Sequence, residues 1–132
     1  PGVGHLMIQA ASLGLNNLRV LNLDVWSVLP SLPAASLACL QIFFPDPWHK
    51  KRHHKRRLIT ALFLDAAAEK LQTGGILHIA TDWQPYAEEI KACLESHPSF
   101  SLSAAPARVE TKYERRGQRL GHVVTDLAAR AR

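Results

Sequence analysis

Residues 43 to 57 concentrate the residue types that could hold a nucleic acid. The segment reads Phe-Phe-Pro-Asp-Pro-Trp-His-Lys-Lys-Arg-His-His-Lys-Arg-Arg. One carboxylate, Asp46, lies between two prolines, and the aromatic ring of Trp48 follows it. Six cations then fall within eight residues, from Lys50 to Arg57. This order of groups indicates a site that holds a nucleic-acid base beside a reactive centre. The carboxylate can accept hydrogen bonds from a base N–H, the flat ring can stack on the base, and the cationic strip can bind phosphates.

A second segment, Thr111 to His122, repeats the mixture of cations and other polar groups. Counted from Arg108 it adds five cations, so the two segments hold 11 of the 16 lysines and arginines. The net charge of +5 and the pI near 9.6 favour a polyanionic partner, because basic faces neutralise phosphates and release their counterions. The run Thr111 to Glu114, with a hydroxyl, a cation, an aromatic ring and a carboxylate, is by itself a weak signal.

Each of these features has a simpler alternative. Pro-Asp-Pro is good turn chemistry, so Asp46 could be a turn residue, and Trp48 could pack instead of stacking on a base. The strip Lys50 to Arg57 could be a solvated loop, although six cations without an acidic neighbour repel one another and favour a bound anion. The three histidines of the segment are not expected to bind a metal, because the flanking cations would repel one; they are His49, His53 and His54.

The composition is typical of one globular domain. The 132 residues include 47% hydrophobic residues, which is enough for a core. The two cysteines, Cys39 and Cys93, give no disulfide framework and are expected to be buried thiols of a cytoplasmic protein. There is no apolar stretch of about 18 residues and no visible signal peptide, so no membrane span is expected.

The first half of the chain alternates helical and strand-like patterns, which predicts an α/β sheet. Leu37 to Phe44 is almost continuously apolar, as in a central parallel strand that is covered on both faces. The other predicted elements are a helix from His5 to Leu13 closed by Gly14, a strand from Leu18 to Leu23, one helical turn from Val25 to Leu29, and a helix from Leu58 to Leu71 ended by Gly74-Gly75.

The second half continues the alternation. Ile76 to Ala80 is predicted to be a strand that delivers Thr81-Asp82-Trp83 at its carboxyl end, and a helix follows from Pro85 to about Ser96. Two final strands, Ser99 to Ala104 and His122 to Ala128, are expected to flank a loop from Thr111 to Arg119. No internal repeat or low-complexity linker interrupts the chain.

Three acidic residues share one position in this pattern. Asp24, Asp46 and Asp82 each follow the carboxyl end of a predicted strand, which is the edge where open parallel sheets bind ligands. Asp82 could instead be an N-cap of the following helix, and Asp24 a turn residue. No role is assigned to the remaining histidines, His5, His78, His97 and His122.

Four strings of residues resemble the tRNA (guanine-N7-)-methyltransferase family. They are Phe44-Pro45-Asp46-Pro47-Trp48-His49-Lys50, Arg52-His53-His54-Lys55-Arg56-Arg57, Ala80-Thr81-Asp82-Trp83 and Thr111-Lys112-Tyr113-Glu114-Arg115-Arg116-Gly117. The resemblance covers nearly the whole chain, and their order and approximate spacing agree with the family.

The resemblance implies a Rossmann-like class I methyltransferase fold, with a mostly parallel sheet and helices on both faces. It further implies transfer of a methyl group from S-adenosyl-L-methionine to guanine N7 in the variable loop of tRNA. Asp24 and Asp46 are then expected to bind the cofactor, and Asp46 also matches the proposed catalytic residue. The resemblance assigns substrate contacts to Lys50, Asp82, Thr111, Lys112, Tyr113 and Glu114, and RNA contacts to Arg52, His53, His54, Lys55, Arg56 and Arg57.

The chain departs from the family at its start. The family's glycine-rich first loop and the acidic residue at the end of its second strand have no match here, and both are expected before Pro1. The chain therefore resembles the C-terminal two-thirds of a methyltransferase domain that works with tRNA, as a monomer or a homodimer. A non-catalytic RNA-binding module is the main alternative, while a fragment of a nicotinamide-dependent dehydrogenase would fit the sheet but not the cationic strip.

Overall fold

The computed structural model describes residues 1–132 and divides into two compact units, residues 1–31 and 32–132, each considered by itself. The first unit holds α1 (Gly2–Ser12), α2 (Val25–Val28) and the 3-10 turn η1 (Leu29–Ser31). These elements confirm the predicted first helix, which begins earlier than expected, and the helical turn before the prolines. Gly14 follows α1 with a φ of 68°, a conformation that glycine adopts without steric cost.

The predicted strand from Leu18 to Leu23 is wrong. This segment forms no strand, and none of the four strands of the chain pairs with it. Its leucines, among them Leu21 and Leu23, are exposed. An apolar pattern predicts a strand only where a neighbouring strand completes the hydrogen bonds of the backbone, and the pattern alone does not supply that neighbour.

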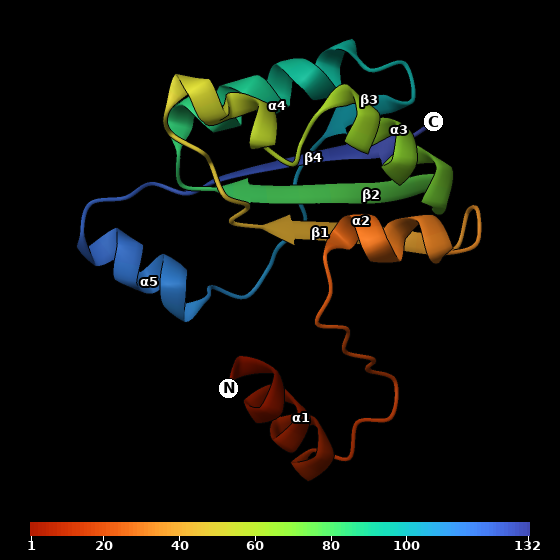
Figure 1. The fold of residues 1–132 in the computed structure, drawn as a ribbon, viewed down its shortest axis with the longest axis vertical. Coiled ribbons are helices and arrows are strands. Elements are labelled where there is room, and N and C mark those ends of the chain that lie inside the picture. Colours follow the sequence, from red (N-terminus) through yellow and green to blue (C-terminus); the bar gives the residue numbers. More distant parts are fainter. The chain divides into compact units, whose positions relative to one another are not determined.

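The second unit is built on a four-stranded mixed sheet with the order β1-β2-β4-β3 (Figure 1). The strands are β1 (Leu37–Phe43), β2 (Leu71–Thr81), β3 (Phe100–Ser103) and β4 (Thr125–Ala131). The pair β1–β2 is parallel, whereas β4 is antiparallel to both β2 and β3. Three strands therefore run in one direction, and the reversed strand β4 lies between two of them.

The reversal of β4 follows from the path of the chain. After β3 the chain forms α5 (Lys112–Arg119), which lies beyond the carboxyl ends of β1 and β2 in Figure 1. Because the chain stays at this edge, the next strand has to start here and run back along the sheet. The segment from Thr111 to Arg119, predicted to be a loop, is thus a helix capped by Thr111, whose hydroxyl accepts a hydrogen bond from the Glu114 N–H.

The helices α3 (Ala61–Lys70) and α4 (Gln84–Ser96) pack against the sheet, α3 on β2 and α4 on β2, β3 and β4. The core between them is formed by large buried side chains, including Ile59, Phe63, Leu64, Leu77, Ile79, Tyr86, Ile90, Leu94 and Phe100. The predicted helix after Pro85 is confirmed as α4, and its inward face buries Tyr86, Ile90 and Leu94. No helix of the structure combines the length and apolar character that spanning a membrane requires.

The sequence predicted that the helix would end at Gly74-Gly75, but α3 already ends at Lys70. It begins after Thr60, whose hydroxyl caps it, and passes directly into β2 at Leu71. The glycines lie within β2 instead. A Cβ on Gly75 would come within 2.8 Å of the Gln72 carbonyl oxygen and 3.2 Å of the Ala38 carbonyl oxygen, so close packing of backbones explains this glycine.

Strand β1 is an edge strand, which corrects its predicted place at the centre of the sheet. Only β2 pairs with it, and none of its residues is fully buried. The prediction of buried thiols is wrong for the same reason, because Cys39 on β1 is exposed. Cys93 on α4 is half-buried, and burial raises the pKa of its thiol.

Candidate functional site

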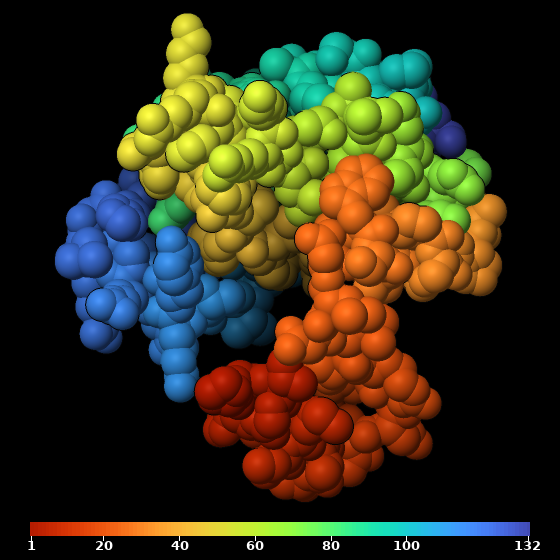
Figure 2. All heavy atoms as spheres, in the orientation of Figure 1, coloured from red at the N-terminus to blue at the C-terminus, as the bar shows by residue number.

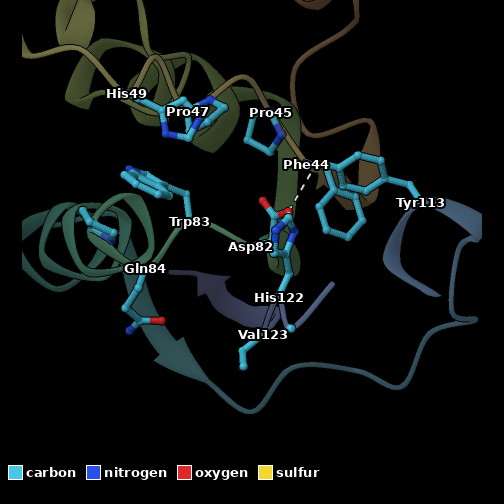
Figure 3. A pocket seen from close by; sticks show the side chains of 12 residues that line it. Phe44, Pro45, Pro47, His49, Asp82, Trp83, Gln84, Tyr113, His122 and Val123 are labelled. Carbon is cyan, nitrogen blue, oxygen red and sulfur yellow. Dashed lines mark hydrogen bonds and ion pairs between the residues drawn. The ribbon is translucent and has the colours of Figure 1, made fainter. Parts of the chain in front are cut away.

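A pocket of about 510 Å³ opens at the carboxyl ends of β1 and β2 (Figure 3). The residues after β1, the residues after β2, the start of α4 and the segment around α5 all contribute to it. Its lining consists of Phe44, Pro45, Pro47, His49, Asp82, Trp83, Gln84, Pro85, Tyr113, Gly121, His122 and Val123. The volume lies in the range of pockets that hold small organic groups such as a base.

Asp82 is the carboxylate of this pocket. Its Oδ2 accepts a hydrogen bond of 3.3 Å from the Tyr113 hydroxyl and lies 3.5 Å from His122 Nδ1. The negative charge of Asp82 raises the pKa of the Tyr113 phenol, and burial and the hydrogen bond act in the same direction. Asp82 is not an N-cap, because α4 begins after Trp83 and has no side-chain cap. It is therefore a hydrogen-bond acceptor with its orientation fixed from two sides.

Aromatic rings form two walls of the pocket (Figure 3). The rings of Phe44 and Tyr113 lie 4.9 Å apart, and those of His49 and Trp83 lie 4.2 Å apart in an edge-to-face arrangement. Flat rings around a carboxylate can sandwich a base and accept hydrogen bonds from its edge. Trp48 is not one of these rings, since its ring contacts His53 and the Arg56 guanidinium instead.

Asp46 follows β1 and is not itself a lining residue of the pocket, although its neighbours Pro45 and Pro47 are. Its side chain is exposed, and its Oδ1 accepts a hydrogen bond of 3.0 Å from the Trp48 N–H, which is the turn geometry that the sequence left open. Two bulky residues beside it are strained, with φ angles of 55° at Phe44 and 44° at Trp48. Each such residue costs about 1–3 kcal/mol, and strain of this kind gathers at functional sites.

Asp24 lies in the first unit. Its Oδ1 accepts a hydrogen bond of 2.8 Å from the Trp26 N–H, so it is the N-cap of α2. Asp24 and Asp46 therefore share one arrangement, in which one oxygen is bound by the N–H two residues later and the side chain stays exposed. The second oxygen of each carboxylate is open to accept a hydrogen bond from a ligand.

The cationic strip folds into the 3-10 helix η2 (Lys51–Arg56), visible in yellow at the surface in Figure 2. Its exposed cations are Lys50, Lys51, Arg52, Lys55 and Arg56. His53 and His54 are half-buried, and His54 Nε2 lies 3.2 Å from the His49 carbonyl oxygen. The exposed cations present positive charge beside the residues that line the pocket.

Arg57 departs from the expectation of an RNA contact. It is only 5% exposed, its Nε donates to the Pro47 carbonyl at 2.6 Å, and its Nη1 pairs with Glu89 on α4. The guanidinium also lies 4.8 Å from the centre of the Tyr86 ring. Arg57 thus fastens the Pro-Asp-Pro turn to α4 and does not belong to the exposed strip.

The predicted substrate residues from Thr111 to Glu114 also divide into one that lines the pocket and others that stabilise the fold. Tyr113 reaches the pocket, whereas Thr111 caps α5 and Glu114 is buried in an ion pair with Arg108. Arg108 also binds Asp126, and its hydrogen bonds lower the pKa of both carboxyls. This network fixes α5 against β4 and so places Tyr113.

Two contributors were not predicted from the sequence. His122 lies 40 residues after Asp82 and meets it only because the chain returns to the same edge of the sheet. In the sequence, Arg108 was counted only as one of the five cations of the second basic segment, and no structural role was predicted for it. Two further histidines pair with carboxylates away from the pocket lining, each at 2.7 Å; the pairs are His78 with Asp126 and His97 with Asp65.

Comparison with known proteins identifies the relatives of the chain. Residues 1–127 match a family model described as "Putative methyltransferase". A tRNA (guanine-N(7)-)-methyltransferase of Nitrosococcus oceani is 52% identical over 96% of this chain and 56% of the relative. A protein of the same name from Halorhodospira halophila is 51% identical over 100% of this chain and 61% of the relative. The chain thus spans a little over half of the length of these curated relatives.

A solved structure gives the same architecture. The protein, from Thermus thermophilus, is described as a "Putatative DNA Modification Methylase". It aligns with a TM-score of 0.55 over 82% of this chain and 50% of its own, at 17% sequence identity. At this identity the likeness concerns the fold alone, which is methyltransferase-like.

Proposed function

The chain belongs to the methyltransferase family that includes the tRNA (guanine-N(7)-)-methyltransferases, and from this premise we propose that it contributes to methyl transfer onto guanine N7 in the variable loop of tRNA. The observation that carries the proposal is the pocket at the carboxyl ends of β1 and β2, where Asp82 lies between aromatic walls beside the Pro-Asp-Pro turn. Both units are taken as parts of one Rossmann-like class I domain, the architecture that this family implies.

From the family we propose Asp24 and Asp46 as residues that bind S-adenosyl-L-methionine. What supports this within each unit is an exposed carboxylate that keeps one oxygen open for a hydroxyl or amino group. When bound, this cofactor would supply an electrophilic methyl group, with its sulfonium sulfur as the leaving group. The strained turn around Asp46 holds the carboxylate between Pro45 and Pro47, which line the pocket, so it can act on the same ligand.

Asp82 would select guanine among the bases. A carboxylate accepts hydrogen bonds and donates none, so it suits the N1–H and amino group on the guanine edge opposite N7. Tyr113 and His122 hold this carboxylate in place, which reduces the reorganisation needed when the base arrives. Phe44 and Trp83 supply rings against which the base can stack.

The chemistry needs no strong general base. Guanine N7 carries a lone pair and no proton, so alignment of the two reactants accounts for most of the task. Such alignment can contribute about 7–11 kcal/mol in bimolecular reactions. Positive charge builds on the base as the methyl arrives, and the carboxylates of Asp46 and Asp82 stabilise that charge. The target base has to leave its stack first, at a cost of a few kcal/mol.

The exposed cations of η2 would bind the tRNA backbone next to the pocket. Lys50, Arg52, Lys55 and Arg56 form no ion pair with a carboxylate of the protein, so they remain open to phosphates. We include Lys112 and the half-buried His53 and His54 among the RNA and substrate contacts proposed from the family. Three of the residues proposed from the family stabilise the fold instead of contacting RNA. Thr111 caps α5, Glu114 pairs with Arg108, and Arg57 anchors the Pro-Asp-Pro turn.

The test is methylation of a tRNA transcript by the protein that carries this chain, with S-adenosyl-L-methionine labelled in its methyl group. We expect the label in N7-methylguanosine from the variable loop after digestion to nucleosides. The matched control is the same transcript with 7-deazaguanine at the target position. This base keeps the N1–H and amino group but has a carbon in place of N7, and it should accept no methyl group.

Two results would contradict the proposal. Label on another atom would show that the pocket presents a different edge of the base. Tight binding of tRNA without any transfer to guanine would favour the alternative function of a non-catalytic RNA-binding module, for which the cationic strip is the specific observation.

A further inference from the structure

Helix α5 carries a second cationic surface, separate from η2. Lys112, Arg115, Arg116 and Arg119 have the spacing of one helix face, and together they line a shallow hollow of about 190 Å³. All four are exposed, and α5 lies at the surface in Figure 2, coloured blue. These four residues are called the α5 basic face.

The α5 basic face is hardly neutralised within the protein. Glu110 is its one acidic neighbour, 4.0 Å from Arg115 Nε, while Glu114 on the same helix is buried in its ion pair with Arg108. Like charges three and four residues apart on a helix destabilise it by a few tenths of a kcal/mol per pair. The arrangement therefore costs stability in the free protein, and a bound anion would remove that cost.

The same helix reaches the pocket from its other side. Tyr113 lies next to Lys112 in sequence and donates to Asp82 in the pocket. The α5 basic face spans about 10 Å along the helix axis, which corresponds to about three phosphates of one helical strand. A nucleotide with its base beside Asp82 would have its neighbours within reach of this face.

The chemistry of α5 favours a nucleic acid over a lipid surface. A helix that binds membranes places an apolar face opposite its cations. The inward side of α5 buries Glu114 and Gly117, so no apolar face is available to enter a bilayer.

We propose that the α5 basic face binds consecutive phosphates of the RNA strand whose target base enters the pocket beside Asp82. The inference rests on the proposed function and adds to it a second backbone contact, on the opposite side of the pocket from η2. The base would thus be delivered between two cationic surfaces, each holding the strand on one side of the target nucleotide.

The test compares two double variants of the protein that carries this chain. Arg116→Ala with Arg119→Ala removes two charges from the α5 basic face. Lys91→Ala with Arg130→Ala removes two exposed charges from α4 and β4, outside both cationic surfaces. Binding of a tRNA transcript is measured over a range of salt concentrations for both variants and for the unchanged protein, and methylation by the unchanged protein is measured alongside.

The proposal predicts different salt dependences for the two variants. The α5 variant should bind more weakly, and its slope of log K against log salt should fall by about 1.4–1.8, since each phosphate contact contributes about 0.7–0.9. The control variant should keep the slope of the unchanged protein. Arg116→Lys with Arg119→Lys should restore most of the slope, because a phosphate contact needs the charge more than the guanidinium shape.

The outcomes separate this inference from the function on which it rests. Equal slopes in the two alanine variants, with methylation of tRNA by the unchanged protein, would overturn the inference and leave the function standing. Absence of both tRNA binding and methylation in the unchanged protein would overturn the proposed function, and the inference with it.

Discussion

Arg57 Nε donates a hydrogen bond of 2.6 Å to the carbonyl oxygen of Pro47 and thereby ties the cationic strip to the turn at the pocket rim. The same guanidinium pairs with Glu89 and lies over the Tyr86 ring. Its Nη2 is buried without a hydrogen-bond partner. The planar shape of the guanidinium serves three contacts from one side chain, a combination that lysine cannot supply.

Arg57→Ala should lower the free energy of unfolding by about 1–3 kcal/mol, because it leaves the Pro47 carbonyl and Glu89 without their donor. Arg56→Ala, one residue earlier and exposed, should leave stability within about 0.5 kcal/mol and weaken tRNA binding instead. Urea unfolding and salt-dependent tRNA binding of both variants check this contrast. Equal stability of the two variants would show that the Arg57 contacts contribute nothing.

Asp46→Ala should reduce methyl transfer by well over tenfold in the protein that carries this chain. Removal of one preorganised polar group at a reacting centre costs about 2.7–4 kcal/mol of transition-state stabilisation. The side chain is exposed, so the fold should remain intact. Steady-state kinetics with tRNA, beside circular dichroism, measure both effects. A folded variant with near-normal turnover would remove Asp46 from the catalytic site.

Tyr113→Phe tests whether the hydrogen bond from the Tyr113 hydroxyl to Asp82 contributes to methyl transfer. The change deletes the hydroxyl that donates to Asp82 and keeps the ring that packs on Phe44. Loss of one such hydrogen bond corresponds to about 0.5–1.5 kcal/mol, or about a two- to tenfold fall in kcat/KM for tRNA. Asp82→Asn should cost more, since it removes the charge itself. A Phe variant as impaired as the Asn variant would mean that Tyr113 contacts the substrate directly.

The sequence predicted the parts of the site that lie within one short segment. Asp46 and the exposed cations of η2 belong to a continuous run, and a strand followed by Asp82 was visible from the apolar pattern of β2. Local patterns report whether a residue follows a strand or belongs to a helix, because neighbours in the chain fix those properties.

The remaining features depend on contacts between distant segments. Nothing near Arg57 in sequence distinguishes it from Arg56, and only the approach of α4 with Glu89 buries it. The meeting of His122 with Asp82 likewise requires the reversed strand β4, which returns the chain to the carboxyl edge of the sheet. The edge position of β1 could not be predicted either, because an apolar strand pattern does not show how many strands pair with it.

The protein should lose stability in acid through the ion pairs of Arg108. Arg108 lowers the pKa of Glu114 and of Asp126, which is also bound by His78. A carboxyl with a lower pKa in the folded state binds fewer protons than in the unfolded state, so stability is present above the ordinary carboxyl pKa of about 4 and is lost as the pH falls below it. The free energy of unfolding should therefore decrease steeply in this acidic range.

Arg108→Met should remove this pH dependence. At neutral pH it leaves Glu114 without an ion-pair partner and Asp126 with His78 alone, which costs about 3–5 kcal/mol. Once the pH falls below the lowered pKa values of Glu114 and Asp126, both carboxyls are protonated in both proteins, so the difference in stability should shrink. Urea unfolding across this range measures the difference, with the exposed Arg115→Met as the matched control and Arg108→Lys as an intermediate that keeps the charge. A penalty for Arg108→Met that stays constant with pH would show that packing of the side chain, and not its charge, stabilises the segment around α5.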